Sequence, residues 1–141
     1  MGEAYLKGLL IHVASDHSTK PYVCGPLSSD DTFEFIPIVE SNSHAVGRKY
    51  TETPTRFPYH GSYLSELIPQ EYENSTVHFD PDLRNGNGTY GEPYGSMRAT
   101  KIACLDPGDY LFFVASLAPF DPEVYKVRNA SWMQSHQRGK M

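Results

Sequence analysis

The strongest structural signal in the chain lies at residues 106–117, which read Asp106-Pro107-Gly108-Asp109-Tyr110-Leu111-Phe112-Phe113-Val114-Ala115-Ser116-Leu117. Proline at the second position of the first four residues favours a tight turn, because its ring presets the backbone angle required there. The apolar run that follows is continuous rather than alternating, which is typical of a strand covered on both faces. We therefore predict a central, fully buried strand over Tyr110–Leu117, in which replacing Phe112 by Ala would cost about 3–5 kcal/mol.

Shorter patterns elsewhere predict three more strands and one helix. Leu9–Ala14 is an apolar run typical of a buried strand, and Thr32–Ile38 alternates apolar and polar residues as a half-buried strand does. Val77–Phe79 predicts a further short strand. Ser62–Ile68 predicts a short helix with Ser62 as its N-cap and a proline directly after it. Mostly strands with a few short helices indicate an α+β fold.

Length and composition fit a single domain. A chain of 141 residues is one domain's worth, and its N-terminus does not resemble a signal peptide. With no apolar run of membrane-spanning length, we expect a cytoplasmic protein without a membrane partner. Residues 41–59 predict a long loop, and residues 125–141 a polar tail. Because no strand follows the central one, we expect the natural protein to continue past Met141.

The charge balance limits the kind of nucleic-acid binding that the sequence supports. The chain carries 12 basic and 17 acidic residues, for a net charge of −5. This balance argues against an extended phosphate track driven by net charge, although it allows a local basic patch. We therefore expect a nucleotide-sized ligand rather than a long nucleic-acid footprint.

Residues that can bind a metal or move a proton alternate in the segment His78-Phe79-Asp80-Pro81-Asp82-Leu83-Arg84. In an extended strand alternate side chains share one face, so His78, Asp80 and Asp82 would lie about 6–7 Å apart. Imidazole and carboxylate groups suit several divalent metal ions, and neighbouring carboxylates often differ in pKa. The pattern predicts a catalytic or metal-binding trio. The alternative is an Asp-Pro-Asp turn whose side chains accept backbone amide hydrogen bonds.

A glycine-containing loop follows this trio and carries candidate ligand-binding residues. Arg84 and Arg98 are predicted to bind phosphate, because guanidinium forks match phosphate oxygens and glycines let backbone amides approach an anion. Tyr90 and Tyr94 are predicted to stack on a base. The glycine spacing fits neither the P-loop nor the dinucleotide-binding fingerprint. A plain surface loop with packed tyrosines is the alternative interpretation.

Two further carboxylates are secondary candidates. Asp16 follows the first predicted strand and Asp109 precedes the strongest one, and functional side chains often lie at such loop positions. Turn geometry alone also accounts for Asp109. The chain has no GxSxG elbow, no HExxH motif and no Cys–His pair of recognised spacing, so those hydrolase classes have no support.

Several of these segments, taken in order, resemble the third type of nucleotide-modification-associated domain, a group of small domains linked to DNA-base modification systems. The resemblance covers roughly residues 9–117 and rests most on the His-x-Asp-Pro-Asp-Leu segment and the Pro-Gly-Asp strand. Its other parts are the early strand ending at Ser15-Asp16, Gly25-Pro26-Leu27, Phe33-Glu34-Phe35-Ile36-Pro37-Ile38 and Tyr90-Gly91. The resemblance implies a nucleotide or modified base as ligand. The Pro-Gly-Asp strand is also similar to PUA-like β-barrels, the alternative fold, which read RNA or modified bases.

Three hypotheses about function follow. In the first, the domain acts on or senses a nucleotide through His78, Asp80 and Asp82, with arginine contacts to phosphate and a divalent metal as the candidate cofactor. In the second, it is a non-catalytic reader in which tyrosines stack a flipped base. In the third, it is a plain interaction domain. The sequence leaves open whether the protein is an enzyme, and it does not set the oligomeric state.

Overall fold

The computed structural model of the chain describes residues 5–13, 18–84, 86, 88–92, 95–121 and 123. The predicted tail at 125–141 and the candidates Asp16 and Tyr94 lie outside the described residues. The described part contains short strands, one short α-helix and several 3-10 helices. The strands are β1 (Gly8–His12), β2 (Gly25–Leu27), β3 (Ile38–Val39), β4 (Val77–His78), β5 (Tyr110–Val114) and β6 (Leu117–Pro119).

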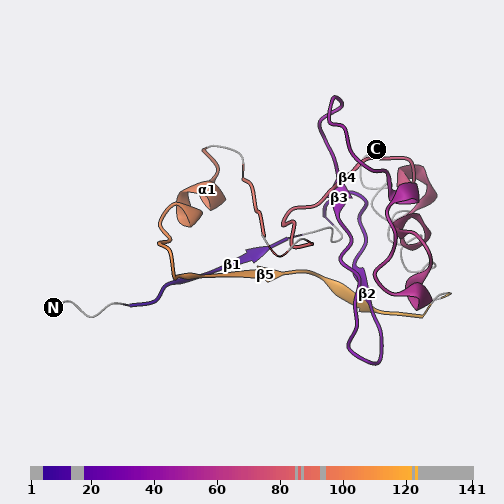
Figure 1. Cartoon of the computed structure of the whole chain (residues 1–141), viewed down its shortest axis with the longest axis horizontal. Helices are drawn as coiled ribbons and strands as arrows, with labels where there is room; N and C mark the ends of the chain where they lie inside the picture. The colour runs from indigo at the N-terminus through magenta and orange to yellow at the C-terminus, as the bar shows by residue number, and fades with distance from the viewer. Residues whose placement is uncertain are drawn as a thin grey trace, which may run out of the picture. The chain divides into compact units, whose positions relative to one another are not determined.

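The strands pair two by two. β1 runs parallel to β5, β2 runs parallel to β6, and β3 runs antiparallel to β4. Figure 1 shows β1 beside β5, and β3 beside β4. Short helices and small sheets confirm the predicted α+β class, and the strands that the structure describes do not close into the alternative PUA-like barrel.

Contacts along the chain divide it into two compact units. Unit 1 comprises Met1–Val13 and Asp80–Val114, and unit 2 comprises Ala14–Phe79 and Ala115–Met141. The expectation of one domain over residues 1–141 stays a prediction. No helix within the described residues has both the length and the apolar character needed to cross a lipid bilayer.

Unit 1 is built on the parallel pair β1–β5. Its register runs from Gly8 opposite Tyr110 to His12 opposite Val114. The helix α1 (Met97–Ile102) precedes β5, and the side chain of its N-cap Ser96 accepts a hydrogen bond from the Ala99 amide at 3.0 Å. The sequence analysis did not predict this helix, although Ser96 is a favoured N-cap residue.

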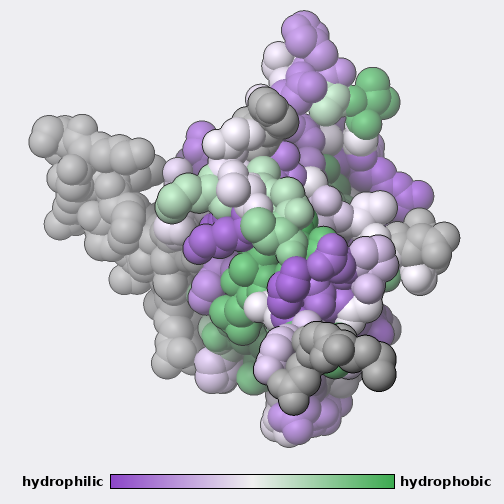
Figure 2. Space-filling view, turned by 90° about the vertical axis from the view of Figure 1, so that its left-hand side faces the viewer, coloured by the Kyte–Doolittle hydropathy of each residue, from purple (hydrophilic) through white to green (hydrophobic). Residues whose placement is uncertain are grey.

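The prediction of a central, fully buried strand over Tyr110–Leu117 is wrong. β5 ends at Val114, its one neighbour among the described strands is β1, and the side chains of Tyr110 and Phe112 are 55% and 53% exposed. β1 is likewise only partly buried, since Leu10 is exposed while Ile11 is buried. Figure 2 shows hydrophobic residues in green at the surface, beside hydrophilic residues in purple. The predicted cost of replacing Phe112 rested on full burial and does not apply to a half-exposed ring.

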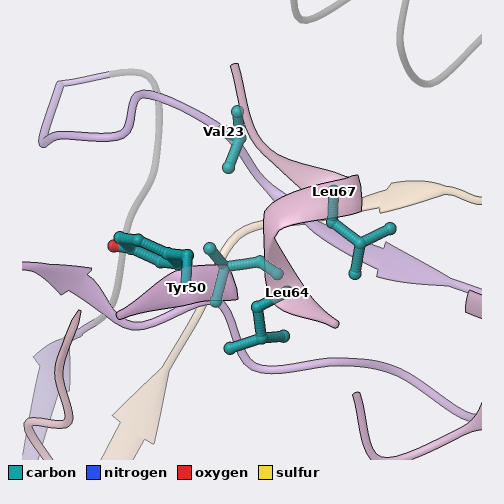
Figure 3. Packing of buried hydrophobic residues seen from close by; sticks show 5 residues of the cluster. Val23, Tyr50, Leu64 and Leu67 are labelled. Atoms are coloured by element: carbon teal, nitrogen blue, oxygen red, sulfur yellow. The ribbon is translucent and has the colours of Figure 1, made fainter. Parts of the chain in front are cut away.

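Unit 2 holds the hydrophobic core. Its buried members come from a loop, an extended segment and two 3-10 helices, η1 (Tyr50–Glu52) and η3 (Leu64–Leu67). Figure 3 shows how Val23, Tyr50, Leu64 and Leu67 pack together. The Tyr50 hydroxyl donates a hydrogen bond to the Pro37 carbonyl at 2.7 Å. The predicted loop at residues 41–59 therefore supplies a central core residue.

The predicted helix at Ser62–Ile68 is a short 3-10 helix rather than an α-helix. Ser62 does not cap it with its side chain. Instead, the carboxylate of Glu66 accepts hydrogen bonds from the backbone amides of Ser62 and Tyr63 at 2.8 and 3.1 Å. Glu66 is the third residue of the helix, and its side chain reaches back to the amide of the N-cap residue Tyr63, as in one half of a capping box.

The segment predicted as a half-buried strand, Thr32–Ile38, buries a glutamate and leaves a phenylalanine partly exposed. Phe33 is 42% exposed, whereas Glu34 and Ile36 are 3% and 1% exposed. Of the predicted range only Ile38 belongs to a strand, β3. A glutamate occupies the buried face here because it has buried hydrogen-bond partners, the amide of Phe57 and the imidazole of His60.

Candidate functional site

The segment from His78 to Arg84 crosses the boundary between the two units. β4 ends at His78, which belongs to unit 2, whereas Asp80 and Asp82 belong to unit 1. The extended strand that would have aligned the three side chains on one face is therefore absent beyond His78 in this described segment. Pro81, which has no amide to donate to a strand pairing, accounts for the early end. That the trio forms one site stays a prediction.

His78 is held by a carboxylate of the neighbouring strand segment. β3 and β4 place Ile38 opposite His78, and the His78 Nδ1 atom lies 2.6 Å from Oε2 of Glu40. The pKa of Glu40 is lowered, first by a hydrogen bond from the Asn42 amide and then by the one from His78. A carboxylate that fixes the orientation of an imidazole is the arrangement used by histidines that transfer protons or bind metals.

Asp82 and Arg84 form a bidentate ion pair in unit 1. Arg84 Nε and Nη2 lie 2.9 and 2.7 Å from the two carboxylate oxygens of Asp82, and the Arg84 amide donates to Oδ1 at 3.1 Å. These hydrogen bonds, first those of the guanidinium, lower the pKa of Asp82 to about 2. The backbone of Asp82 also exchanges hydrogen bonds with Thr89 at 2.8 and 3.0 Å, which closes the intervening loop.

Replacing Arg84 by Gln is expected to raise the pKa of Asp82 from about 2 towards its ordinary value of 3.8. Because the folded pKa is depressed, the pair stabilises unit 1 above pH 3.8, and this contribution is lost as the pH falls towards 2. An NMR titration of the carboxyl carbon of Asp82 measures the change. Arg98→Gln is the matched control and should leave Asp82 unshifted. An Asp82 pKa that stays near 2 in the Arg84 variant contradicts the assignment.

The remaining candidates of unit 1 lie beside the same loop. Asp80 Oδ1 accepts a hydrogen bond from the Gly91 amide at 3.0 Å. Glu92 connects the next two candidates, because it hydrogen-bonds the Tyr90 hydroxyl and its Oε1 lies 3.4 Å from Nη1 of Arg98. Unit 1 therefore brings the two aspartates and both arginines to the loop between residue 82 and the start of α1.

The Tyr90 ring already has an aromatic neighbour. Its centroid lies 5.1 Å from that of Phe113 on β5. Burial, and then the hydrogen bond to Glu92, raise the pKa of Tyr90 to about 12. Tyr90 therefore packs against β5, and its predicted role in stacking on a base stays a prediction.

Asp109 has a structural role in the turn before β5. Its carboxylate accepts hydrogen bonds from the amides of Lys7 and Asp106 at 3.0 and 2.8 Å, and these bonds, first that of Asp106, lower its pKa. It thereby ties the start of β5 to the residue before β1. In the part of the chain that the structure describes, no group of three or more His, Cys, Asp or Glu side chains is placed to hold a metal ion.

Sequence reasoning missed a buried polar cluster in unit 2. His60 Nδ1 lies 3.2 Å from Oε1 of Glu34, and His60 Nε2 lies 2.7 Å from Oγ of Ser28. His60 is 32 residues from Ser28 and 26 from Glu34, and the three residues follow no known motif. The one signal was a glutamate within an apolar strand pattern.

The comparisons with known proteins place the chain in a family. The sequence model of nucleotide modification associated domain 3 matches residues 7–138. No curated protein and no solved structure matches the chain. The match covers nearly the whole sequence, including both units and all the candidate residues named above, and it confirms the resemblance seen in the sequence. The chain therefore belongs to the nucleotide modification associated domain 3 family.

Proposed function

We propose that this domain binds a nucleotide or a modified base, which it acts on or senses, and that Arg84 and Arg98 contact the phosphate. The observation that carries the proposal is that both arginines are exposed although each is paired with a carboxylate. They lie in a domain associated with nucleotide modification. Arg84 forms an ion pair with Asp82 and Arg98 with Glu92, while their side chains remain 52% and 56% exposed. Phosphate oxygens accept the same charge-assisted hydrogen bonds as a carboxylate, so the exposed guanidinium groups can also contact a phosphate.

The acidic residues supply the rest of the proposed chemistry. Asp82 is ionised at neutral pH, and Asp80 lies two residues before it beside the Gly91 amide. A divalent ion, if bound, would bridge carboxylates to a phosphate. His78 is the candidate acid–base group, because Glu40 orients its imidazole. A non-catalytic reader that stacks a base on tyrosine is the alternative, and the packing of Tyr90 against Phe113 gives it less support.

The test is a binding titration with a mononucleotide and with duplex DNA over a series of salt concentrations. Binding through two or three phosphate contacts should give a salt slope of magnitude roughly 2–3. Arg84→Gln and Arg98→Gln should each weaken mononucleotide binding about 10-fold or more, since each removes charge-assisted hydrogen bonds.

Arg48→Gln is the control, because it removes the same charge from an exposed position in unit 2. Equal weakening in this control would show a general charge effect and contradict the assigned roles. A slope of about 6 or more on duplex, without a mononucleotide response, would instead indicate a duplex-binding surface. If neither ligand binds, the interaction-domain interpretation stands.

A further inference from the structure

A hydroxyl, an imidazole and a carboxylate form a hydrogen-bonded series in unit 2. Ser28 comes directly after β2, and His60 is the last residue of the 3-10 helix η2 (Pro58–His60). Ser28 Oγ lies 2.7 Å from His60 Nε2, and His60 Nδ1 lies 3.2 Å from Glu34 Oε1. The side chains of His60 and Glu34 are 0% and 4% exposed, whereas Ser28 is only partly buried. The series therefore runs from the interior towards solvent.

The hydrogen-bond partners assign the protons of this series. Glu34 Oε1 accepts from the Phe57 amide at 2.7 Å, as well as facing His60. An ionised carboxylate only accepts, so Nδ1 of His60 carries the hydrogen between them. In the neutral imidazole Nε2 is then the acceptor, and the Ser28 hydroxyl donates to it. This is the protonation state in which histidine can act as a general base towards serine.

Aromatic rings hold the imidazole in place. The ring centroid of His60 lies 4.6 Å from that of Tyr59, 4.7 Å from that of Phe120 and 5.8 Å from that of Phe57, all in edge-on arrangements. These neighbours exclude water from the imidazole, which hydrogen-bonds Ser28 and Glu34. Because water is excluded, the electrostatic interactions within the series are stronger than they would be in solvent, and the imidazole is held in one orientation.

The Ser28 loop is fastened to the same segment. The Ser28 amide donates to the Thr32 carbonyl at 2.8 Å, and Asp31, at φ 65°, donates its amide to the Ser28 carbonyl at 3.0 Å. Asp30 accepts from the Thr32 hydroxyl at 2.6 Å and from the Tyr59 hydroxyl at 3.4 Å. The hydrogen bond from Tyr59 to Asp30 thus joins the loop after Ser28 to the η2 segment, which limits movement of the Ser28 hydroxyl.

We propose that Ser28 is a nucleophile towards carboxylic esters, with His60 as its general base and Glu34 as the positioning residue. Ser28 Oγ forms a bond to the carbonyl carbon while its proton passes to Nε2 of His60, and the carbonyl electron pair moves to the oxygen. Collapse of this intermediate breaks the ester bond, and the leaving alkoxide takes the proton from His60 as an alcohol. Water then attacks the acylated Ser28 in the same way, which releases a carboxylic acid and restores the hydroxyl.

The charges around Ser28 favour a neutral ester over a phosphate ester. Asp30 and Asp31 follow Ser28 within three residues, and the Thr32 hydroxyl lowers the pKa of Asp30, which keeps it ionised. A phosphate ester would bring further negative charge against these carboxylates. The half-exposed ring of Tyr59, beside Phe57, offers an apolar surface for the acyl group instead. This activity is separate from the proposed nucleotide binding in unit 1.

The first test is covalent labelling of the full chain with a neutral fluorophosphonate, followed by peptide mass spectrometry. The expected result is a single adduct on Ser28, which is lost in Ser28→Ala and kept in Ser29→Ala. Ser28 is partly exposed, so its truncation to Ala should leave unit 2 folded, which circular dichroism checks. The absence of an adduct on Ser28 in the folded wild-type chain overturns the proposal, as does equal labelling of Ser29.

The second test follows the hydrolysis of p-nitrophenyl acetate. Wild-type protein should release a burst of p-nitrophenolate no larger than the amount of protein, because acylation precedes deacylation. His60→Gln should slow the burst by about 100-fold or more, the contribution of a general base. Glu34→Gln should slow it while Glu34→Asp restores part of the rate, a rescue that a purely structural role would not give. A burst that survives in Ser28→Ala overturns the proposal.

Discussion

Replacing Tyr50 by Ala is expected to destabilise unit 2 by about 3–5 kcal/mol, the usual cost of truncating a large buried aromatic residue. Tyr50 is 0% exposed and packs with Val23, Ile36, Leu64 and Leu67. The truncation would leave a cavity at the centre of this cluster, and the surrounding segments are too closely packed to close it fully. Urea denaturation followed by circular dichroism measures the loss as a lower midpoint.

Two variants separate the contributions to this loss. Tyr50→Phe keeps the ring and removes the hydroxyl that donates to the Pro37 carbonyl, so it should cost about 1–3 kcal/mol. Tyr63→Ala is the surface control, because Tyr63 is 45% exposed, and it should cost much less than Tyr50→Ala. A loss below about 1 kcal/mol for Tyr50→Ala would show that this cluster does not stabilise the fold.

Removing His60 alone is the second large effect, with an expected cost of about 3–5 kcal/mol for His60→Ala. The substitution leaves the buried carboxylate of Glu34 with the Phe57 amide but without the imidazole at 3.2 Å. It also removes a ring that packs edge-on against Phe120. The measurement is the free energy of unfolding at neutral pH, by urea denaturation.

The double variant Glu34→Leu, His60→Phe tests the cause of the loss. Replacing both polar groups with apolar ones removes the unpaired buried charge, so the double variant should be more stable than His60→Ala. The single variants Glu34→Leu and His60→Phe complete the cycle. If their losses of stability add up to that of the double variant, the pair is not coupled. This outcome concerns stability alone, whereas the reactivity of Ser28 is read from labelling.

The sequence by itself determined where several elements form and to which family the chain belongs. The apolar runs located β1 and β5, although with shorter bounds than expected, and the α+β class followed from these patterns. The turn at Asp106–Asp109 formed as its proline and glycine predict, and Asp109 caps it. These features depend on residues close together in the chain, whose backbone preferences act locally.

Only the tertiary structure decided which faces are buried and which side chains meet. The apolar pattern predicted that Phe112 is covered, yet Phe112 is half exposed, while Glu34 is buried. Burial depends on segments distant in sequence: Glu34 is buried because Phe57 and His60 satisfy its carboxylate. The series from Ser28 to Glu34 through His60 has the same origin, since β2, the following segment and η2 meet only in the folded unit. A local pattern specifies backbone conformation, whereas the partners that make a buried polar group stable are supplied by the fold.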